Sequence, residues 1–289
     1  MLAELFLAPF VEFGFMRRAL LGISLVAVGA APLGVFLLLR RMTLAGEAVA
    51  HGILPGIAVA YVISGLSLAA LTLGGVAGGL VVALSATWMA RRTVLREDAT
   101  LAVLYLMAVA LGVLLISSHG RNVDLLHLLF GGILALDDPT LGLLCGIAAV
   151  TVVAMTALRR PLTFESVDPD FMRVVSTRGG FIHAAFMALV VLNLVAGFHA
   201  LGTLLALGIM VLPAAAARCW SQRLGVILAL AVAVAWLGGF SGLLLSFHLD
   251  VPSGPAIVAT TGLLFVASLL LSPDSGLSRH RISGSSTTA

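Results

Sequence analysis

Uncharged apolar stretches alternate with short charged clusters along the whole chain. The sequence has no Lys, and seven stretches also lack Asp, Glu and Arg: 19–39, 48–90, 99–120, 139–158, 179–217, 224–249 and 251–273. A helix needs about 20 apolar residues to cross a bilayer, so five stretches fit one helix each and two fit a pair. Breaks containing Gly and polar residues, at 64–67 and 197–202, divide the two longest stretches. The pattern predicts an all-α integral membrane protein with about nine transmembrane helices, with eight or ten also possible.

Composition supports this fold class and excludes others. The 289 residues are 61% hydrophobic and 10% charged, with a mean hydropathy of +1.16, far from the values of soluble domains. The net charge of +3 is too small and too dispersed for a nucleic-acid surface. Cys145 and Cys219 lie in or beside apolar runs without a metal-ligand spacing, so we expect no disulfide framework.

Arginine placement predicts the orientation, because short cytoplasmic loops carry the excess of positive charge. With nine spans, thirteen of the sixteen arginines fall on one side, and Arg17, Arg18 and Arg121 are left on the other. This favours an outside N-terminus and an inside C-terminus. The residues before the first span resemble an amphipathic lead-in to it rather than a cleaved signal.

The same pattern predicts how the chain is divided. Residues 1–272 form a single transmembrane domain, within which 159–180 is the largest inside segment. The Ser/Thr/Gly-rich stretch 273–289 reads as a disordered cytoplasmic tail.

One ionisable pair stands out in the second predicted span. Glu47 and His51 are four residues apart, so on a helix they share a face. His51 would lie near the middle of the hydrocarbon core, and the Pro55-Gly56 step just beyond it would free backbone carbonyls or flex a gate. Imidazole and carboxylate suit zinc and manganese, and a twofold dimer would supply four ligands. The structural alternative is that His51 bonds a neighbouring helix and Glu47 pairs with an Arg.

Other polar residues give weaker signals. His248 and Asp250, near an outer helix end, could attract cations at the mouth of a pathway. His183 and His199 flank one apolar span, where interfacial positions are the simplest interpretation.

The sequence also offers partial matches to catalytic motifs. The sequence GFSG at 239–242 has the form of an intramembrane serine nucleophile, but the nearest His, His248, lies seven residues beyond and does not reach Ser241. Small residues at this spacing more often let helices approach closely. A zinc peptidase would need HExxH, which does not occur. A Walker A sequence is also absent, so ATP hydrolysis would need another chain.

Five segments, in order, resemble the zinc/manganese ABC importer permeases, which are the membrane subunits of the ABC-3 family. They are RRMTLAGEAVAHGILPGIAVA (40–60), LLFGGILALDD (128–138), SVDPDFMRVVSTRGG (166–180), LGTLLALGIMVLPAAAAR (201–218) and DVPSGPAIV (250–258). The resemblance covers residues 14 to 272. It implies a type II ABC importer-like permease in the bacterial cytoplasmic (inner) membrane, surrounded by lipid, with no enzymatic activity and no permanently bound cofactor.

The resemblance also implies partners and site residues. A solute-binding protein outside the membrane would deliver Zn²⁺ or Mn²⁺, a cytoplasmic ATPase dimer would drive alternating access, and a second copy of the chain would complete a homodimer. The family motif implicates the positions of Glu47, commonly Asp in the family, and His51 in metal coordination. The resemblance makes the inside segment 159–180 the cytoplasmic coupling segment, with the family motif at 166–180, where Asp168, Phe171, Met172 and Arg173 are the docking candidates.

Three alternatives remain open at this point. They are a permease for a metal chelate or vitamin-sized cargo, a secondary transporter driven by a proton gradient, and an intramembrane serine hydrolase using Ser241. The ligand types do not separate zinc from manganese or iron, because His and carboxylate bind all three.

Overall fold

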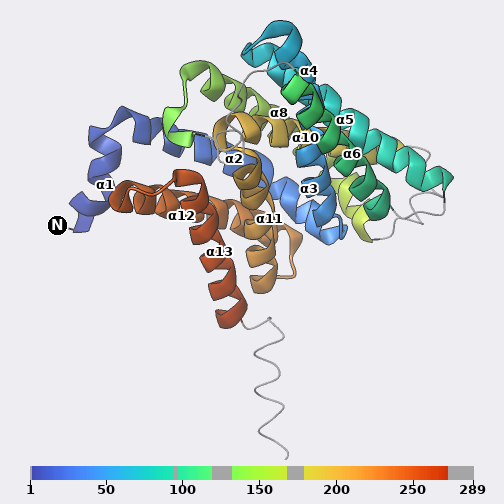
Figure 1. Cartoon of the computed structure of the whole chain (residues 1–289). Helices are drawn as coiled ribbons and strands as arrows, with labels where there is room; N and C mark the ends of the chain where they lie inside the picture. The colour runs from blue at the N-terminus through green and yellow to red at the C-terminus, as the bar shows by residue number, and fades with distance from the viewer. Residues whose placement is uncertain (1, 94–96, 119–131, 168–178, 273–289) are drawn as a thin grey trace, which may run out of the picture.

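The computed structural model describes residues 2–93, 97–118, 132–167 and 179–272, and all of its regular elements in these ranges are helical (Figure 1). The predicted tail 273–289 and the four predicted coupling residues, Asp168, Phe171, Met172 and Arg173, lie outside the described residues. In chain order the helices are α1 (Leu2–Glu12), α2 (Gly14–Leu39), α3 (Thr43–Gly52), α4 (Leu54–Ser64), α5 (Leu68–Arg92), α6 (Glu97–Ser118), the 3-10 turn η1 (Ile133–Ala135), α8 (Asp138–Val167), α10 (Gly179–Leu201), α11 (Thr203–Trp220), α12 (Leu224–Leu249) and α13 (Ser253–Leu271).

The predicted spans correspond to these helices. Within the described ranges, seven segments are long and apolar enough to cross a membrane, and two shorter apolar helices, Ala99–Leu115 and Leu205–Trp220, occupy the remaining predicted spans. Both predicted breaks are present, at Gly65 with φ 66° and at Gly202 with φ 79°, a conformation that favours glycine. The predicted all-α membrane fold is confirmed, and the helix count agrees with about nine.

Helix α2 lies at the centre of the packing. It contacts α8, α11 and α12, and α10 connects this core to α5. At Gly34 the backbones of α2 and α11 approach so closely that a Cβ atom would stand 1.7 Å from the Met210 carbonyl oxygen. Figure 1 shows α3 to α6 on one side of α2, with α12 and α13 on the other.

Helices α3 and α4 form one span, Thr43–Ser64. Ile53 between them keeps helical angles, and its N–H donates to the carbonyl of Val49 at 3.1 Å. Pro55 has no N–H to donate to the carbonyl of His51, four residues earlier, so the helix is weakened at this turn. The predicted break at Pro55-Gly56 therefore interrupts a span without ending it.

Two ion pairs show that α2 and α8 run in the same direction, as the alternation of the spans between them requires. Arg18 near the start of α2 pairs with Asp138 at the start of α8, with 3.1 Å between Nη2 and Oδ1. At the opposite end of the same two helices, Arg40 pairs with Glu165. Arg18, one of the arginines discordant with the orientation rule, thus has a carboxylate beside it.

Helix α8 continues nine residues beyond the predicted span. Residues 159–167, expected as part of a separate inside segment, complete this helix. Pro161 lies inside it, and the Thr163 hydroxyl donates to the carbonyl of Arg159 at 2.7 Å.

Candidate functional site

Helix α3 presents two different faces. Its buried residues are all small or β-branched: Ala45, Gly46, Ala48, Val49, Ala50 and Gly52. At Gly52 an added Cβ would stand 3.0 Å from the side chain of Val82 on α5, and at Gly46 it would stand 3.1 Å from Leu207 on α11. These close contacts fix the rotation of α3, so the opposite face points away from the core.

The outward face of α3 carries both residues of the predicted pair. Glu47 is exposed, and His51 is half-buried. The His51 ring lies beside the ring of Tyr105 on α6, with centroids 5.8 Å apart and planes inclined by 30°. In the part of the chain that the structure describes, neither Glu47 nor His51 has a hydrogen bond or an ion pair. The structural alternative, in which an Arg neutralises Glu47, therefore finds no support among these residues.

An apolar groove begins one turn beyond His51. It has a volume of about 680 Å³ and lies between α4, α5 and α6, starting at Gly52 and Pro55. Its floor is the crossing of α4 and α5, where a Cβ on Gly56 would stand 2.0 Å from the Gly74 carbonyl oxygen. The lining includes no charged side chain. The open face of α3 and this groove form one continuous surface along the second span.

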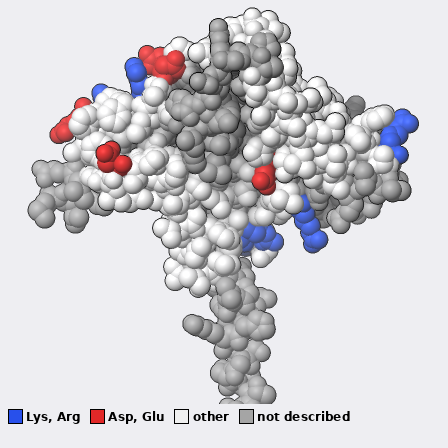
Figure 2. All heavy atoms as spheres, viewed as in Figure 1, with Lys and Arg blue, Asp and Glu red and all other residues white. Residues whose placement is uncertain are grey.

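One copy of the described chain does not complete a metal site. No three His, Cys, Asp or Glu side chains within the described ranges lie close enough to hold an ion together. Figure 2 shows the same scarcity from outside, with Asp, Glu and Arg as small separated spots on the visible face. Glu47 and His51 are therefore two ligands of an incomplete set.

The weaker metal candidates lie elsewhere. His248 and Asp250 are both exposed at the C-terminal end of α12, where Asp250 caps the helix with φ 52°. Helix α12 packs on α2, α11 and α13, on the far side of α2 from α3 (Figure 1). The two candidate pairs thus occupy separate regions of the molecule.

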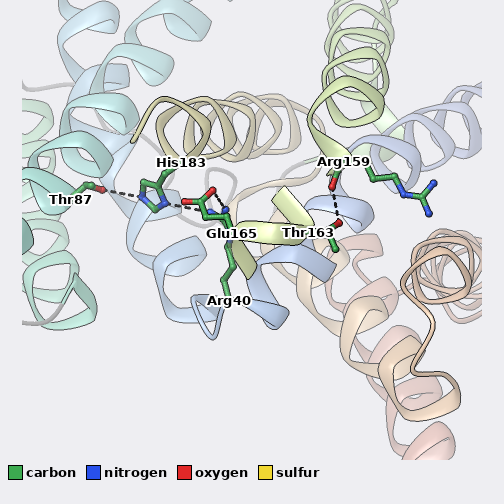
Figure 3. A network of polar contacts seen from close by, with 6 residues as sticks. All are labelled: Arg40, Thr87, Arg159, Thr163, Glu165 and His183. Atoms are coloured by element: carbon green, nitrogen blue, oxygen red, sulfur yellow. Dashed lines mark hydrogen bonds and ion pairs between the residues drawn. The ribbon is translucent and has the colours of Figure 1, made fainter. Parts of the chain in front are cut away.

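Sequence reasoning missed a buried polar cluster at the predicted inner ends of four helices. It consists of Arg40, Thr87, Glu165 and His183, from α2, α5, α8 and α10, and is called the Arg40 network below (Figure 3). His183, expected at an interface, is 8% exposed. No local motif could have indicated the cluster, because its members are separated by tens of residues. The one available signal was an Arg and a Glu at the ends of predicted spans.

Two further polar groups are used in packing. Asn193 on α10 donates to the Thr151 hydroxyl on α8 at 2.7 Å and to the Leu189 carbonyl at 2.9 Å. The Nδ1 atom of His199 lies 2.8 Å from the Val195 carbonyl oxygen. The Asn193–Thr151 bond joins α10 to α8 without requiring a ligand, whereas the bonds to the Leu189 and Val195 carbonyls lie within α10.

The geometry does not favour a serine hydrolase. The Ser241 hydroxyl donates to the Leu237 carbonyl of its own helix at 2.8 Å. The neighbouring glycines serve close packing, since a Cβ on Gly242 would stand 2.4 Å from the Cα of Ile257 on α13. The glycines beside Ser241 therefore lie in helix contacts, as the spacing of small residues predicted.

Comparison with known proteins gives consistent matches over nearly the whole chain. The profile of the ABC 3 transport family matches residues 12–272. The manganese transport system membrane protein MntC of Halalkalibacterium halodurans is 31% identical over 273 residues, which cover 94% of this chain and 92% of that protein. The manganese import system permease protein ScaB of Streptococcus parasanguinis is 28% identical over 272 residues, covering 94% and 96%. The solved structure of PsaBC from Streptococcus pneumoniae in complex with Fab matches with a TM-score of 0.85 and 27% identity, over 97% of this chain and 100% of that one.

Proposed function

The chain belongs to the ABC 3 transport family, and on that premise we propose that Glu47 and His51 form half of its metal-transport site. The protein is the multi-pass membrane permease subunit of a metal ABC importer in the bacterial inner membrane, and ATP hydrolysis takes place on a separate partner chain. An importer of this class also works with a solute-binding protein. The observation that carries the proposal is a carboxylate and an imidazole on the open face of a membrane span, without a hydrogen bond or an ion pair among the described residues.

A second copy of the chain completes the site. An exposed carboxylate such as Glu47 within a span is costly against lipid, so its surface must be covered. A twofold partner covers α3 with the same surface and brings a second Glu47 and His51 to the first pair. The adjoining groove of about 680 Å³ extends this apolar surface toward the outer end of α4. The homodimer and the four-ligand site are thus one proposal.

Manganese is the proposed cargo. Two relatives carry manganese in their names, and paired carboxylates and imidazoles suit a metal that accepts oxygen and nitrogen ligands. Zinc accepts the same ligands, so the assignment depends on direct comparison of the two ions. Transport needs only ligand exchange at the Glu47/His51 level as the permease alternates between outward and inward states. Asp168, Phe171, Met172 and Arg173 remain the predicted contacts of the ATPase.

Uptake in proteoliposomes tests the proposal. The vesicles contain the permease, its cognate ATPase and its binding protein, and uptake of Mn²⁺ and Zn²⁺ is measured beside ATP hydrolysis. His51→Ala and Glu47→Ala are expected to abolish uptake while assembly and basal ATP hydrolysis persist. Glu12→Ala, which removes an exposed carboxylate on α1, is the matched control and is expected to transport normally. Uptake that survives both substitutions would overturn the site, and His248 and Asp250 would be tested next.

A further inference from the structure

The Arg40 network joins α2 to α8 and α10 through one side chain. The Arg40 guanidinium pairs with the carboxylate of Glu165, its Nη1 lies 3.4 Å from His183 Nδ1, and its carbon lies 4.8 Å from the centre of the Phe186 ring. The side chains of Arg40 and Glu165 are only 6% and 14% exposed. Figure 3 shows Arg40, Glu165 and His183 converging from different helices.

The hydrogen bonds of the network have a defined direction. A guanidinium can only donate, so Nδ1 of His183 accepts from Arg40 and the proton of the neutral ring lies on Nε2. This Nε2–H donates to the Thr87 hydroxyl on α5 at 3.3 Å, and that hydroxyl donates to the Ala83 carbonyl at 3.1 Å. The chain of bonds thus runs from α2 through α10 to α5.

The network lies between two functional parts of the chain. Glu165 is near the end of α8, three residues before the predicted coupling residue Asp168. Arg40 caps the C-terminus of α2, seven residues before Glu47. The corner between α2 and α3 is tight: Arg41 has φ 57°, and the Met42 N–H donates to the Leu37 carbonyl at 2.8 Å. A displacement of Arg40 is therefore passed directly to the start of α3.

We propose that the Arg40–Glu165 pair is a positioning joint that makes α3 follow the ATPase-facing end of α8. The inference rests on the proposed transport function, because it assigns the purpose of the movement to the Glu47/His51 site. A buried ion pair contributes little net stability compared with apolar packing, so its value lies in specifying one geometry. Two packed helices with such a link move as a unit, which is how a distant site is coupled mechanically.

The test compares coupling with stability in the assembled transporter. Glu165→Gln removes the charge and keeps the size of the side chain. Arg40→Gln removes the charge and also shortens the side chain, and Arg40→Lys keeps the charge without the planar fork. Arg159→Gln on α8 is the matched control, since this guanidinium points away from Glu165 in Figure 3. Metal uptake per ATP hydrolysed is expected to fall about tenfold in both Gln variants, within the usual range of coupling between sites. The Lys variant is expected to retain part of the native uptake per ATP hydrolysed, and the Arg159→Gln control is expected to keep the native value.

A second measurement does not depend on metal transport. A nitroxide at Leu44→Cys, on the exposed first turn of α3, is introduced after Cys145 and Cys219 are replaced by Ala. In the native background, ATP trapping on the partner is expected to change the mobility of the label. In Glu165→Gln that change is expected to vanish while ATP is still hydrolysed.

The outcomes separate the joint from the proposed function. If the label responds equally in Glu165→Gln and the native protein, or responds in neither, the joint is overturned. If the native complex moves α3 with ATP but takes up no metal, the transport proposal fails and the joint stands. A Glu165→Gln variant with lower thermal stability but an unchanged ratio of uptake to ATP hydrolysis would also overturn the joint, because its role would then be structural.

Discussion

Two groups of ionisable side chains lie within the helices of this permease, and they differ in whether the chain itself satisfies them. In the Arg40 network, guanidinium, carboxylate and imidazole neutralise or hydrogen-bond one another. On α3, Glu47 and His51 have no such partner among the described residues. Both groups lie in helices where an unpaired charge is costly. The difference supports the proposal that the second group binds a metal together with a partner subunit, whereas the first group is satisfied within one chain.

The largest expected effect is a loss of stability when the Arg40 network is broken. Glu165→Ala removes the ion pair of Glu165 with the Arg40 side chain, which is only 6% exposed, and is expected to lower the free energy of unfolding by about 3–5 kcal/mol. Unfolding of the purified protein in mixed micelles measures this loss. Glu47→Ala is the contrasting variant and is expected to leave apo-protein stability unchanged or to raise it. If both variants lost the same free energy of unfolding, Glu47 would also have a partner in the native protein. The contrast between the Arg40 network and the Glu47/His51 pair would then be wrong.

The next largest effect tests whether Glu47 and His51 bind a metal. A ligand that binds only the folded protein stabilises it, by about 2.7 kcal/mol at a hundredfold excess over Kd. Mn²⁺ is therefore expected to stabilise the native protein, and removing it with a chelator is expected to reverse the gain. His51→Ala and Glu47→Ala are expected to abolish the stabilisation, whereas Glu165→Gln retains it. Stabilisation that persists in His51→Ala would place the bound ion elsewhere.

A smaller effect concerns the length of the carboxylate at position 47. Glu47→Asp removes one methylene and keeps the charge, so the ligand set remains but its reach changes. We expect Kd for Mn²⁺ to change by up to about tenfold, or about 1.4 kcal/mol, with a different change for Zn²⁺. Competition between the two ions during uptake measures the shift. Identical affinities for both ions in the two proteins would argue that this carboxylate does not touch the metal.

The sequence predicted the fold well because membrane spanning leaves a local signature. Runs without charge give the helices, and Gly65 and Gly202 mark both breaks within the long runs. The extension of α8 to Val167 was missed because Arg159 and Arg160 end the apolar run while the backbone stays helical. Charge marks where a helix leaves the hydrocarbon, and this point need not be where the helix ends.

The site was predictable only in part, for a related physical reason. Glu47 and His51 are one turn apart, so helical periodicity alone places them on one face. The Arg40 network joins residues from four helices, and its geometry depends on how α8 and α10 pack against α2. Pairings of this kind depend on tertiary packing and leave no spacing in the sequence. Even the burial of His183 follows from the positions of Arg40 and Thr87 rather than from its neighbours along the chain.

The smallest effect is expected at the other end of the same two helices. Like Arg40–Glu165, the Arg18–Asp138 pair joins α2 to α8 through an arginine and a carboxylate, but its side chains are 50% and 77% exposed. Arg18→Gln is therefore expected to cost about 0–1 kcal/mol of unfolding free energy, and less at high salt. Its unfolding is measured under the conditions used for Glu165→Ala.

Low pH gives a further test of the outer ends of α2 and α8, through the titration of Asp137. The hydroxyl of Thr140 and then its N–H hold the pKa of Asp137 below its ordinary value of 3.8, with a smaller contribution from Arg18. Because the pKa is lowered in the folded state, the stabilisation by Asp137 is complete above this value and is lost as pH falls below it. Asp137→Asn is expected to reduce the loss of stability between pH 5 and pH 3 slightly, while Arg18→Gln changes it even less. If Arg18→Gln proved as costly at pH 7 as Glu165→Ala, burial would not be what distinguishes the two ends, and the Arg40 network would lose its special status.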